Sequence, residues 1–570
     1  MKRKGFTLIE LLAVIVILAI IALIATPTIL NVIEKARKGA TEQSALGYID
    51  AIEKQIMIND TNNIQELKDG TYLVEDINIS YKGKGPTKGT VTIKKGEVTT
   101  TNLCFKTYSV DYDGTKATIS KNNYCKEDKV ILKEKENINE IAIENKKAVI
   151  DLTNYTDYTN IHCNNNAKLE IENNQLIVTN IIGEVTCQLD KTLEDTFSTL
   201  DDSSNSIMML SDEMLSNGII IEETKNIVLD LNGKKIEKTF EKYDRLLINK
   251  GNLTINDKNN LGIIKTNFAV IINYSKIVIN GGNYIRENPS STSGGVLSLM
   301  NGEAIINGGV FQTDKTYAIL NMSNKNQSTL TVKNATVISE SNGFYIGNEN
   351  ATTSIIHCNV KSTNTGTAIS NNGKMYIENT VAISNKGYSI WNANKGNLVI
   401  NSGGYISEKN TVIANTSSYD ILIKDEKGKT YIASYTTEND QKDVWQSKAI
   451  FNKAKGNIKI EGSIADSCGK TPNKTGTCIY MNYGRAVLNE NNSEGNIYIA
   501  GSYINSENYA IYNYTGNIYI CDSKIEGKTS FHLSGKGYIY YNSKNIFDIN
   551  TSSDINNPSH FILDDTICKG

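Results

Sequence analysis

The pattern of apolar and polar positions changes twice along this chain of 570 residues. An uncharged run, residues 11–33, comes first and is long enough to cross a hydrocarbon core, which needs about 20 residues. An amphipathic stripe follows and predicts that one helix continues over residues 6–60. The stripe consists of Ile29, Ile33, Ala36, Ala40, Ala45, Tyr48, Ile52 and Ile56. Pro27 lies inside the helix, so we expect it to kink the helix rather than end it.

Short alternating runs, which are typical of strands, follow the helix between residues 61 and 128. They cover residues 71–79, 89–100 and 106–119, and the turns between them are rich in Gly, Lys and Asp. This pattern predicts a small β head.

Residues 129–192 begin with a mixed-charge stretch and then show a hairpin pattern. Apolar residues alternate on both sides of a Glu-Asn-Asn turn at 172–174, and Cys163 and Cys187 bracket this region. We interpret it as a small disulfide-closed β spacer.

From about residue 225 the chain repeats itself with a period near 23 residues. Residues 388–408 and 509–527 show the unit clearly: an apolar residue, any residue and Asn, then a turn, a strand ending in Ile, a second turn and a short strand. A unit this short cannot bury a core alone, whereas stacked copies can. We therefore predict a mostly β protein in which residues 193–554 form a right-handed parallel β-helix of about 11 coils. Residues 193–224 would cap it, and residues 555–570 would be a C-terminal tail.

Two other repeat folds have related periods. A leucine-rich repeat requires a Leu consensus that is missing here, and a β-propeller with blades of about 45 residues fits the spacing poorly. The propeller is the alternative fold.

The recurring asparagine has a physical reason. Asn tolerates left-handed turn conformations, and stacked coil on coil it can form an amide ladder. The expected ladder residues are Asn249, Asn273, Asn301, Asn321, Asn348, Asn371, Asn392, Asn415, Asn452, Asn489 and Asn513. The steps on either side of Asn452 are 37 residues long, which predicts two outgrowths from one turn.

Composition narrows the functional classes. The net charge is −3 and no basic stripe occurs beyond the N-terminus, which argues against specific nucleic-acid binding. Only 5 prolines occur among many Tyr, Ile, Thr and Asn residues, which favours an ordered strand-rich chain. No second run is long enough to cross a bilayer, so we expect one span at residues 8–30 and the bulk of the chain outside the cytoplasm.

Nine cysteines occur, so in an exported chain at least one is free or pairs between molecules. Three pairs close in sequence suit disulfides in an oxidising compartment, although buried thiols are the alternative. These pairs are Cys104 with Cys125, Cys163 with Cys187, and Cys468 with Cys478. No CxxC motif occurs and the four histidines are scattered, so we expect no metal site and no cofactor.

The N-terminal segment Lys4-Gly5-Phe6-Thr7-Leu8-Ile9-Glu10 resembles the prepilin signature of type IV pilins and type II secretion pseudopilins. Members share a basic leader ending in Gly, an aromatic first mature residue, an acid four residues later and a proline further along the helix. Gly5, Phe6, Glu10 and Pro27 match these features. The resemblance covers residues 1 to about 128, and it implies a small antiparallel sheet packed on the long helix.

The resemblance also implies how the chain is processed and assembled. A prepilin peptidase and methyltransferase would cut between Gly5 and Phe6, remove the leader 1–5 and methylate the new amine. The helix would stay in the cytoplasmic membrane until it enters a filament with other pilin subunits, at the cell surface. A carboxylate in lipid costs roughly 2.5–3.5 kcal/mol, and in the filament Glu10 would pair with the Phe6 amine of an adjacent subunit. The alternative is an ordinary anchor with Glu10 near the headgroups.

Catalysis is an alternative, because parallel β-helices include pectate lyases and polygalacturonases, whose sites have clustered carboxylates. Arg245, Arg286 and Arg485 are the arginines of the repeats, and none has an acidic cluster nearby in sequence. The pairs 201–202 and 564–565 flank the repeats, whereas sugar hydrolysis needs carboxylates on both sides of one bond. We therefore expect that the protein is not an enzyme.

Aromatic side chains suit contact with sugars or proteins, because a ring packs on apolar patches while its polar end stays wet. The weak candidates are Trp391, Tyr480, Tyr483, Tyr512 and Tyr514, although a strand tyrosine is more often scaffold. The hypothesis is a minor or tip subunit of a type IV pilus or pseudopilus that binds a glycan or a host cell-surface ligand. The alternatives are a pseudopilin of a type II secretion or DNA-uptake (competence) system, and a surface-tethered polysaccharide-degrading enzyme.

Overall fold

The computed structural model describes residues 8–61, 67–106, 108–121, 125–135, 137–242, 244–287, 294–323, 327–440, 447–490, 494–547 and 558–568. It divides into two compact units. Unit 1 comprises residues 1–156, 162–189 and 202–206, and unit 2 comprises residues 157–161, 190–201 and 207–570. The predicted spacer 129–192 is therefore not a unit of its own, because most of it belongs with the head.

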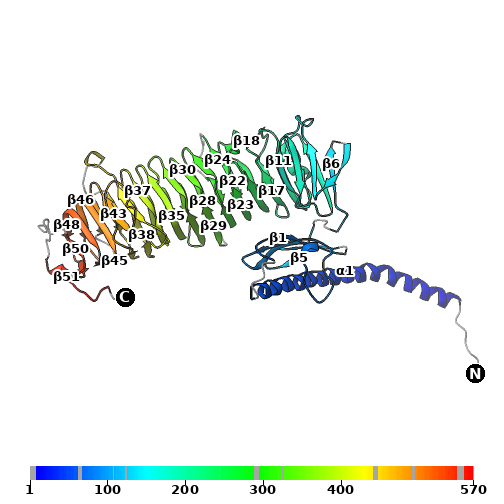
Figure 1. Ribbon diagram of the computed structural model, residues 1–570, viewed down its shortest axis with the longest axis horizontal. Helices are drawn as coiled ribbons and strands as arrows, with labels where there is room; N and C mark the ends of the chain where they lie inside the picture. Colours follow the sequence, from blue (N-terminus) through cyan, green and yellow to red (C-terminus); the bar gives the residue numbers. More distant parts are fainter. Residues whose placement is uncertain are drawn as a thin grey trace, which may run out of the picture. The chain divides into compact units, whose positions relative to one another are not determined.

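Helix α1 (Leu8–Thr61) is the only long helix in the described residues, and it runs unbroken through Pro27 (Figure 1). The predicted apolar stripe is covered only along its second half. Ala45 and Ile52 are fully buried, whereas Ile29 and Ile33 are 56% and 41% exposed. A single copy of the chain therefore leaves an apolar helix surface uncovered.

The predicted antiparallel sheet of the head is confirmed. Its strands are β1 (Gly70–Leu73), β2 (Lys88–Lys94), β3 (Glu97–Phe105), β4 (Tyr108–Tyr112) and β5 (Ala117–Ile119), hydrogen-bonded in that order, with η1 (Val74–Asp76) after β1. Apolar residues of its inner face bury α1: Val91, Ile93, Val98, Leu103, Phe105 and Val110. Alternation along the strands thus supplies the face that covers the second half of the stripe.

The spacer contains the predicted hairpin, formed by β11 (Lys168–Glu172) and β12 (Gln175–Thr179). Asn173 and Asn174 both have positive φ, 49° and 62°, as a two-residue hairpin turn of the primed type requires. The other strands are β6 (Lys129–Glu134), β7 (Asn137–Ile141), β8 (Ile143–Glu144), β9 (Lys147–Asp151), β10 (Asn160–Cys163) and β13 (Glu184–Asp190).

The predicted parallel β-helix is confirmed as a β-solenoid in which each turn adds one strand to each of three parallel faces (Figure 1). Face 1 contains β16 (Ile219–Ile221), β19 (Arg245–Asn249), β22 (Ala269–Asn273), β25 (Gly295–Leu299), β28 (Tyr317–Asn321), β31 (Phe344–Ile346), β34 (Ile369–Asn371), β36 (Ile390–Asn394), β38 (Ile413–Ser417), β41 (Lys448–Asn452) and β44 (Arg485–Asn489).

Face 2 contains β17 (Asn226–Asp230), β20 (Asn252–Asn256), β23 (Lys276–Asn280), β26 (Gly302–Ile306), β29 (Ser328–Lys333), β32 (Ala351–Ile356), β39 (Ile421–Lys424), β42 (Ile458–Glu461), β45 (Ile497–Ala500), β47 (Asn517–Cys521), β49 (Tyr538–Tyr541) and β51 (Phe561–Leu563). Face 3 contains β15 (Glu213–Met214), β18 (Lys235–Lys238), β21 (Ile263–Thr266), β24 (Asn283–Arg286), β27 (Val310–Thr313), β30 (Thr336–Ser339), β33 (Asn359–Ser362), β40 (Thr430–Ser434), β43 (Thr477–Met481) and β50 (Ile546–Phe547). Four long strands bend from one face to the next: β35 (Lys374–Ser384), β37 (Asn397–Ser407), β46 (Ser502–Asn513) and β48 (Lys524–Leu533).

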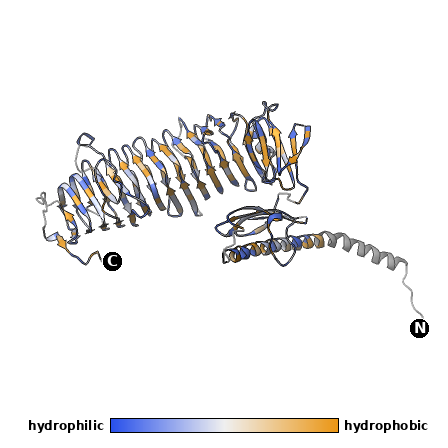
Figure 2. Ribbon diagram, in the orientation of Figure 1, coloured by the Kyte–Doolittle hydropathy of each residue, from blue (hydrophilic) through white to orange (hydrophobic). Residues whose placement is uncertain are grey.

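The core of the solenoid is a set of apolar columns, seen as orange bands alternating with blue along the strands in Figure 2. On face 2, for example, Ile377 pairs with Ile400 and Ile400 with Ile423, and all three are fully buried. Fully burying one such side chain contributes about 1.5–3 kcal/mol, so stacking supplies the stability that a single repeat lacks.

The predicted N-terminal cap already contains solenoid strands, and the C-terminal end of the solenoid extends past its predicted limit at residue 554. Helix α2 (Leu193–Thr199) is capped by the Thr192 hydroxyl, which accepts a 3.0 Å hydrogen bond from the Asp195 amide, and Leu193 enters the solenoid core. Strand β14 (Ser204–Met209) follows, and β15 and β16 already pair with β18 and β19. At the other end, after η4 (Pro558–His560), β51 pairs in parallel with β49, so the predicted tail contributes a strand. The solenoid therefore has about 14 turns rather than 11.

Candidate functional site

Two long connections distinguish the second half of the solenoid. Residues 435–447, which include η2 (Glu438–Asp440), join β40 to β41, and residues 462–476 join β42 to β43. The prediction of one shared turn is wrong, because the first connects face 3 to face 1 and the second connects face 2 to face 3.

The second connection is held firmly on the outer side of face 3. The disulfide Cys468–Cys478 closes it. The Tyr431 hydroxyl donates to the Gly469 carbonyl over 2.7 Å, and the Asn505 amide donates to the Cys468 carbonyl over 2.7 Å. This connection is a fixed part of the surface.

Tyr480 lies under this connection and is only 2% exposed. Burial raises the pKa of Tyr480 to about 12. The structure therefore contradicts its predicted role in binding, because its ring packs with Tyr431 and Tyr503 instead of facing a ligand. Tyr483, between β43 and β44, is half-buried and lies outside the clusters described below.

The outer side of face 1 carries a continuous column of side chains, one from each of six successive coils. We call it the aromatic column, and it consists of Trp391, Ala414, Phe451, Leu488, Tyr512 and His532, paired in register. Four side chains flank it: Tyr388, Lys448, Arg485 and Tyr509. The column arises because the residue before each ladder position faces outward on a pleated strand.

The Tyr512 ring is in contact with the side chains of Arg485 and His532. The Arg485 guanidinium carbon is 4.0 Å from the centre of its ring, and the His532 ring stacks on it at 4.2 Å. Burial raises the pKa of Tyr512 to about 12, and the side chain is 3% exposed. A guanidinium over an aromatic ring is attracted by the ring quadrupole, so this cluster is a rigid centre for the column.

Trp391 is the open end of the column, with 36% of the side chain exposed. Its indole Nε1 donates to the Thr416 hydroxyl over 2.9 Å, and its ring lies 6.1 Å from Tyr388. Tyr514 lies 5.1 Å from Tyr512 and is half-buried. Of the five predicted binding residues, the structure thus brings Trp391, Tyr512 and Tyr514 to one face. Tyr512 is as buried as Tyr480, so Trp391 and Tyr514 are the accessible ones of these three.

The asparagine ladder forms on face 1, although two of its predicted members lie elsewhere. Buried Nδ2 to Oδ1 hydrogen bonds join Asn371 to Asn392 (2.8 Å), Asn392 to Asn415 (3.1 Å), Asn415 to Asn452 (3.1 Å) and Asn452 to Asn489 (3.3 Å). Asn249 donates likewise to Asn273 over 2.6 Å, and Asn321 and Asn513 occupy ladder positions without an Asn partner bond.

The prediction is wrong for Asn301 and Asn348. The register places Leu299 and Ile346 at those ladder positions, and each asparagine lies two residues later, beyond the strand. Turns also favour Asn, so an Asn after the strand imitates the ladder signal in the sequence.

A second ladder was missed by the sequence reasoning. Face 3 ends in fully buried serines on five successive coils: Ser339, Ser362, Ser384, Ser407 and Ser434. Their hydroxyls donate to turn carbonyls, as from Ser384 to Gly366 over 2.9 Å and from Ser407 to Gly387 over 3.0 Å. The repeated Ser at the end of the third strand was the available signal.

Four disulfides and one thiol account for the nine cysteines. The bridges Cys104–Cys125, Cys163–Cys187 and Cys468–Cys478 are present as predicted. The fourth, Cys521–Cys568, was missed because 47 residues separate its partners. Cys358 is the buried free thiol, which explains why the number of cysteines is odd.

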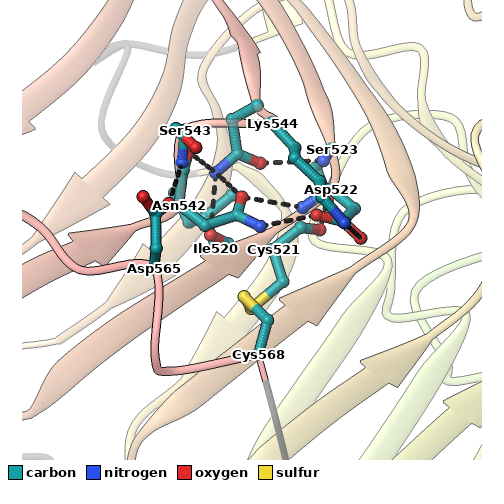
Figure 3. Close-up of polar contacts among 10 residues, drawn as sticks. Ile520, Cys521, Asp522, Ser523, Asn542, Ser543, Lys544, Asp565 and Cys568 are labelled. Carbon is teal, nitrogen blue, oxygen red and sulfur yellow. Dashed lines mark hydrogen bonds and ion pairs between the residues drawn. A yellow bond between two sulfur atoms is a disulfide. The ribbon is translucent and has the colours of Figure 1, made fainter.

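The fourth bridge belongs to a clasp at the C-terminal end of the solenoid (Figure 3). The Asn542 amide donates to Asp522 Oδ1 over 2.5 Å, and the Ser543 backbone amide donates to Asp565 Oδ1 over 2.6 Å. Covalent and polar contacts together hold residues 558–568 against the last coils.

Two arginines in the solenoid contact other parts of the scaffold. Arg286 is fully buried and donates to the Gly294 carbonyl over 2.7 Å, and Arg485 covers Tyr512. Arg245 begins strand β19. Among the residues that the structure describes, no group of three or more His, Cys, Asp or Glu side chains could hold a metal ion.

The predicted processing residues Gly5 and Phe6 lie outside the described residues. Glu10 and Pro27 belong to α1, at positions where the structure describes the backbone but not the side chains. Within the described part of the chain, no helix combines the length and apolar character needed to cross a membrane.

The family profile for the prokaryotic N-terminal methylation motif matches residues 1–26. No curated protein and no solved structure matches significantly. The chain therefore carries the N-terminal methylation signal of the type IV pilin family at residues 1–26 and joins it to a C-terminal parallel β-solenoid.

Proposed function

We propose that this protein is a minor or tip subunit of a type IV pilus or pseudopilus and presents its solenoid as an adhesive module. The observation that carries the proposal is one chain with a methylation motif at residues 1–26 and an uncovered apolar surface further along the same helix. This surface includes Ile29, Leu30, Val32 and Ile33, all exposed. A contiguous exposed apolar surface needs a partner, and neighbouring subunit helices supply one.

The bulk of the solenoid favours a minor or tip position. About 14 turns at a strand spacing of about 4.8 Å extend roughly 65 Å. A shaft in which every subunit carried such a module would be crowded, whereas occasional or terminal subunits have room.

The aromatic column favours adhesion to a glycan. Aromatic rings pack on the apolar faces of sugars, while hydroxyl and indole groups stay available to water and ligand. Trp391 and Tyr388 supply rings beside the exposed end, and the half-buried cation Lys448 borders the same column, whereas Arg485 is buried over Tyr512. This combination favours glycans that carry a negative charge.

A glycan array tests the proposal with the full chain purified in detergent. We expect Trp391→Ala to weaken binding about tenfold or more, as the loss of an exposed aromatic anchor does. Tyr498→Ala is the matched control, because Tyr498 is a half-buried aromatic residue on face 2. Equal binding by the wild type and both variants, or no binding by any of them, would contradict the proposal.

A further inference from the structure

The head has a defined orientation along α1. The Val98 amide donates to Glu53 Oε1 over 3.1 Å, which places the turn between β2 and β3 near the C-terminal end of the helix. The opposite edge of the sheet, with the loop before β2 and the turn between β3 and β4, therefore lies towards the N-terminal part of α1. In a membrane-anchored precursor, this is the edge of the head that faces the membrane.

A groove of about 750 Å³ lies at this edge, between α1 and the two loops. Arg37, Thr41 and Ser44 line it from one face of the helix, at the four- and seven-residue spacing of helical neighbours. Lys84 and Lys106 line it from the loops. Its volume falls in the range of small-ligand sites, about 300–1,000 Å³.

The groove is strongly basic. Its cations are the exposed side chains of Arg37, Lys84 and Lys106, and no Asp or Glu is among its lining residues. Within the described part of the chain, none of these three cations forms an ion pair, whereas the nearby Lys38 is neutralised by Glu34 at 2.7 Å. An anion in the groove would therefore meet three uncompensated charges.

The groove also lies at a particular height above the apolar run. That run ends at Ile33, and Arg37 follows four residues later, about 6 Å along the helix. The headgroup layer adds about 5–8 Å beyond the hydrocarbon core on each side of a bilayer. Basic residues are depleted beside a span on the translocated side, which makes Arg37 unusual at this position. The two loop lysines beside it make the site favourable for an anion.

We propose that this groove binds the phosphate of an anionic phospholipid in the extracytoplasmic leaflet while the subunit waits in the membrane. The inference rests on the anchored precursor that the proposed function includes. Arg37 forms the helix side of the phosphate site, and Lys84 and Lys106 form the loop side. Release of this lipid would accompany extraction of the helix into a filament.

Lysine acylation in reconstituted vesicles tests the inference on the full chain. One vesicle set contains phosphatidylcholine alone, and the other contains phosphatidylglycerol as well. We expect Lys84 and Lys106 to react at least about fivefold more slowly in the anionic vesicles, since each cation near an anionic surface gains roughly that factor. Lys94 and Lys116, which are also exposed but lie at the far edge of the head, should react equally in both sets.

A substitution makes the test specific. Arg37→Gln should return Lys84 and Lys106 towards the reaction rate seen with phosphatidylcholine. Lys54→Gln, which removes an exposed charge from the same helix near its other end, should change nothing.

Several results would overturn the inference. Equal rates in both vesicle sets, with the chain firmly inserted, would remove the lipid site and leave the proposed function intact. Slowing by inorganic phosphate in phosphatidylcholine vesicles would indicate a free anion, and slowing only at high protein density would indicate the acidic surface of a neighbouring copy. Extraction of the chain from both vesicle sets by carbonate would overturn the anchored state, and the proposed function with it.

Discussion

The two halves of the solenoid share one frame but differ in what the frame carries. In the first half, residues 213–347, the asparagine ladder is interrupted by Leu299 and Ile346, and the connections are short. In the second half, residues 351–568, every ladder position from Asn371 to Asn513 is Asn, and hydrogen bonds join these side chains from Asn371 to Asn489. Both long connections, both solenoid disulfides and the aromatic column lie there as well.

The coils therefore fold with residues other than Asn at a ladder position. The long connections, the solenoid disulfides and the aromatic column, by contrast, are confined to one half. Surface loops on a rigid scaffold commonly carry function, and the second half has the loops. The reinforcement by ladder and disulfides coincides with them. We infer that the second half of the solenoid carries the proposed ligand-binding surface and that the first half supports it.

The largest expected effect comes from the C-terminal clasp. Replacing Cys521 and Cys568 together by Ser should destabilise the last coils by about 4 kcal/mol, because the bridge closes 47 residues. Amide hydrogen exchange should show lost protection in β49 and β51 with unchanged protection in β22 and β25. The Cys468–Cys478 pair, which closes 10 residues, is the control and should cost about 3 kcal/mol locally. Equal loss of protection in both halves would remove the distinction between them.

The ladder gives the next largest effect. Asn415→Ala removes one buried acceptor of Asn392 Nδ2, which keeps the Gly396 carbonyl, and the buried amide that donates to Asn452 Oδ1. We therefore expect a loss of about 2–4 kcal/mol in local stability. Asn321→Ala in the first half should cost about half as much, because the Ser328 hydroxyl, which donates to Asn321 Oδ1, can rotate to another acceptor. The Thr353 hydroxyl, which accepts from Asn321 Nδ2, can rotate to another donor. Hydrogen exchange of the flanking coils measures both losses. Ser418→Ala, at an exposed site, is the control and should change stability by less than about 0.5 kcal/mol. A larger cost for Asn321→Ala would reverse the comparison.

High pH should weaken the second half first. Burial raises the pKa of Tyr480 and Tyr512 to about 12, whereas an unfolded tyrosine ionises near 10. Between about pH 10 and 12 the unfolded chain loses these protons and the folded chain keeps them, so stability is intact below pH 10 and falls as pH rises. Among the described residues, the first half buries Tyr284, whereas the second half buries five tyrosines: Tyr405, Tyr431, Tyr480, Tyr503 and Tyr512. Ultraviolet titration with hydrogen exchange should therefore show earlier opening in the second half, and Tyr480→Phe should reduce it. Simultaneous opening of both halves would count against this assignment.

The smallest expected effect concerns surface ion pairs. Glu303→Gln breaks the pair with Lys276 in the first half, and Glu490→Gln breaks the pair with Lys453 in the second half. Both pairs are partly exposed, so each loss should stay below about 1 kcal/mol by denaturant or thermal unfolding. A large loss in one half alone would mean that charge, rather than ladder and disulfide, separates the halves.

Sequence periodicity predicted the frame well, because helix and strand spacings depend on local chemistry. The stripe through Ile52, the sheet of the head and the stacked isoleucines all follow from it. Sequence periodicity failed where the role of a residue depends on its pairing with a neighbouring coil. Asn301 and Asn348 are turn residues that imitate the ladder, and the first and last coils lack its Asn signal.

The candidate site was predictable only in part. Trp391, Tyr512 and Tyr514 do share a face, since their spacing follows the repeat. Tyr480 looked equivalent in sequence, but the connection 462–476 folds over it. The Cys521–Cys568 bridge is likewise a contact through space that no local spacing signals.

The central claim is that the N-terminal helix delivers the solenoid into a filament. Immunogold labelling of filaments sheared from cells, with antibodies against the solenoid, tests it most directly. We expect sparse or terminal labelling with the wild-type chain and no labelling with Glu10→Ala, while Glu34→Ala in the same helix leaves labelling unchanged. Wild-type filaments without solenoid label, or equal labelling with Glu10→Ala, would contradict the claim.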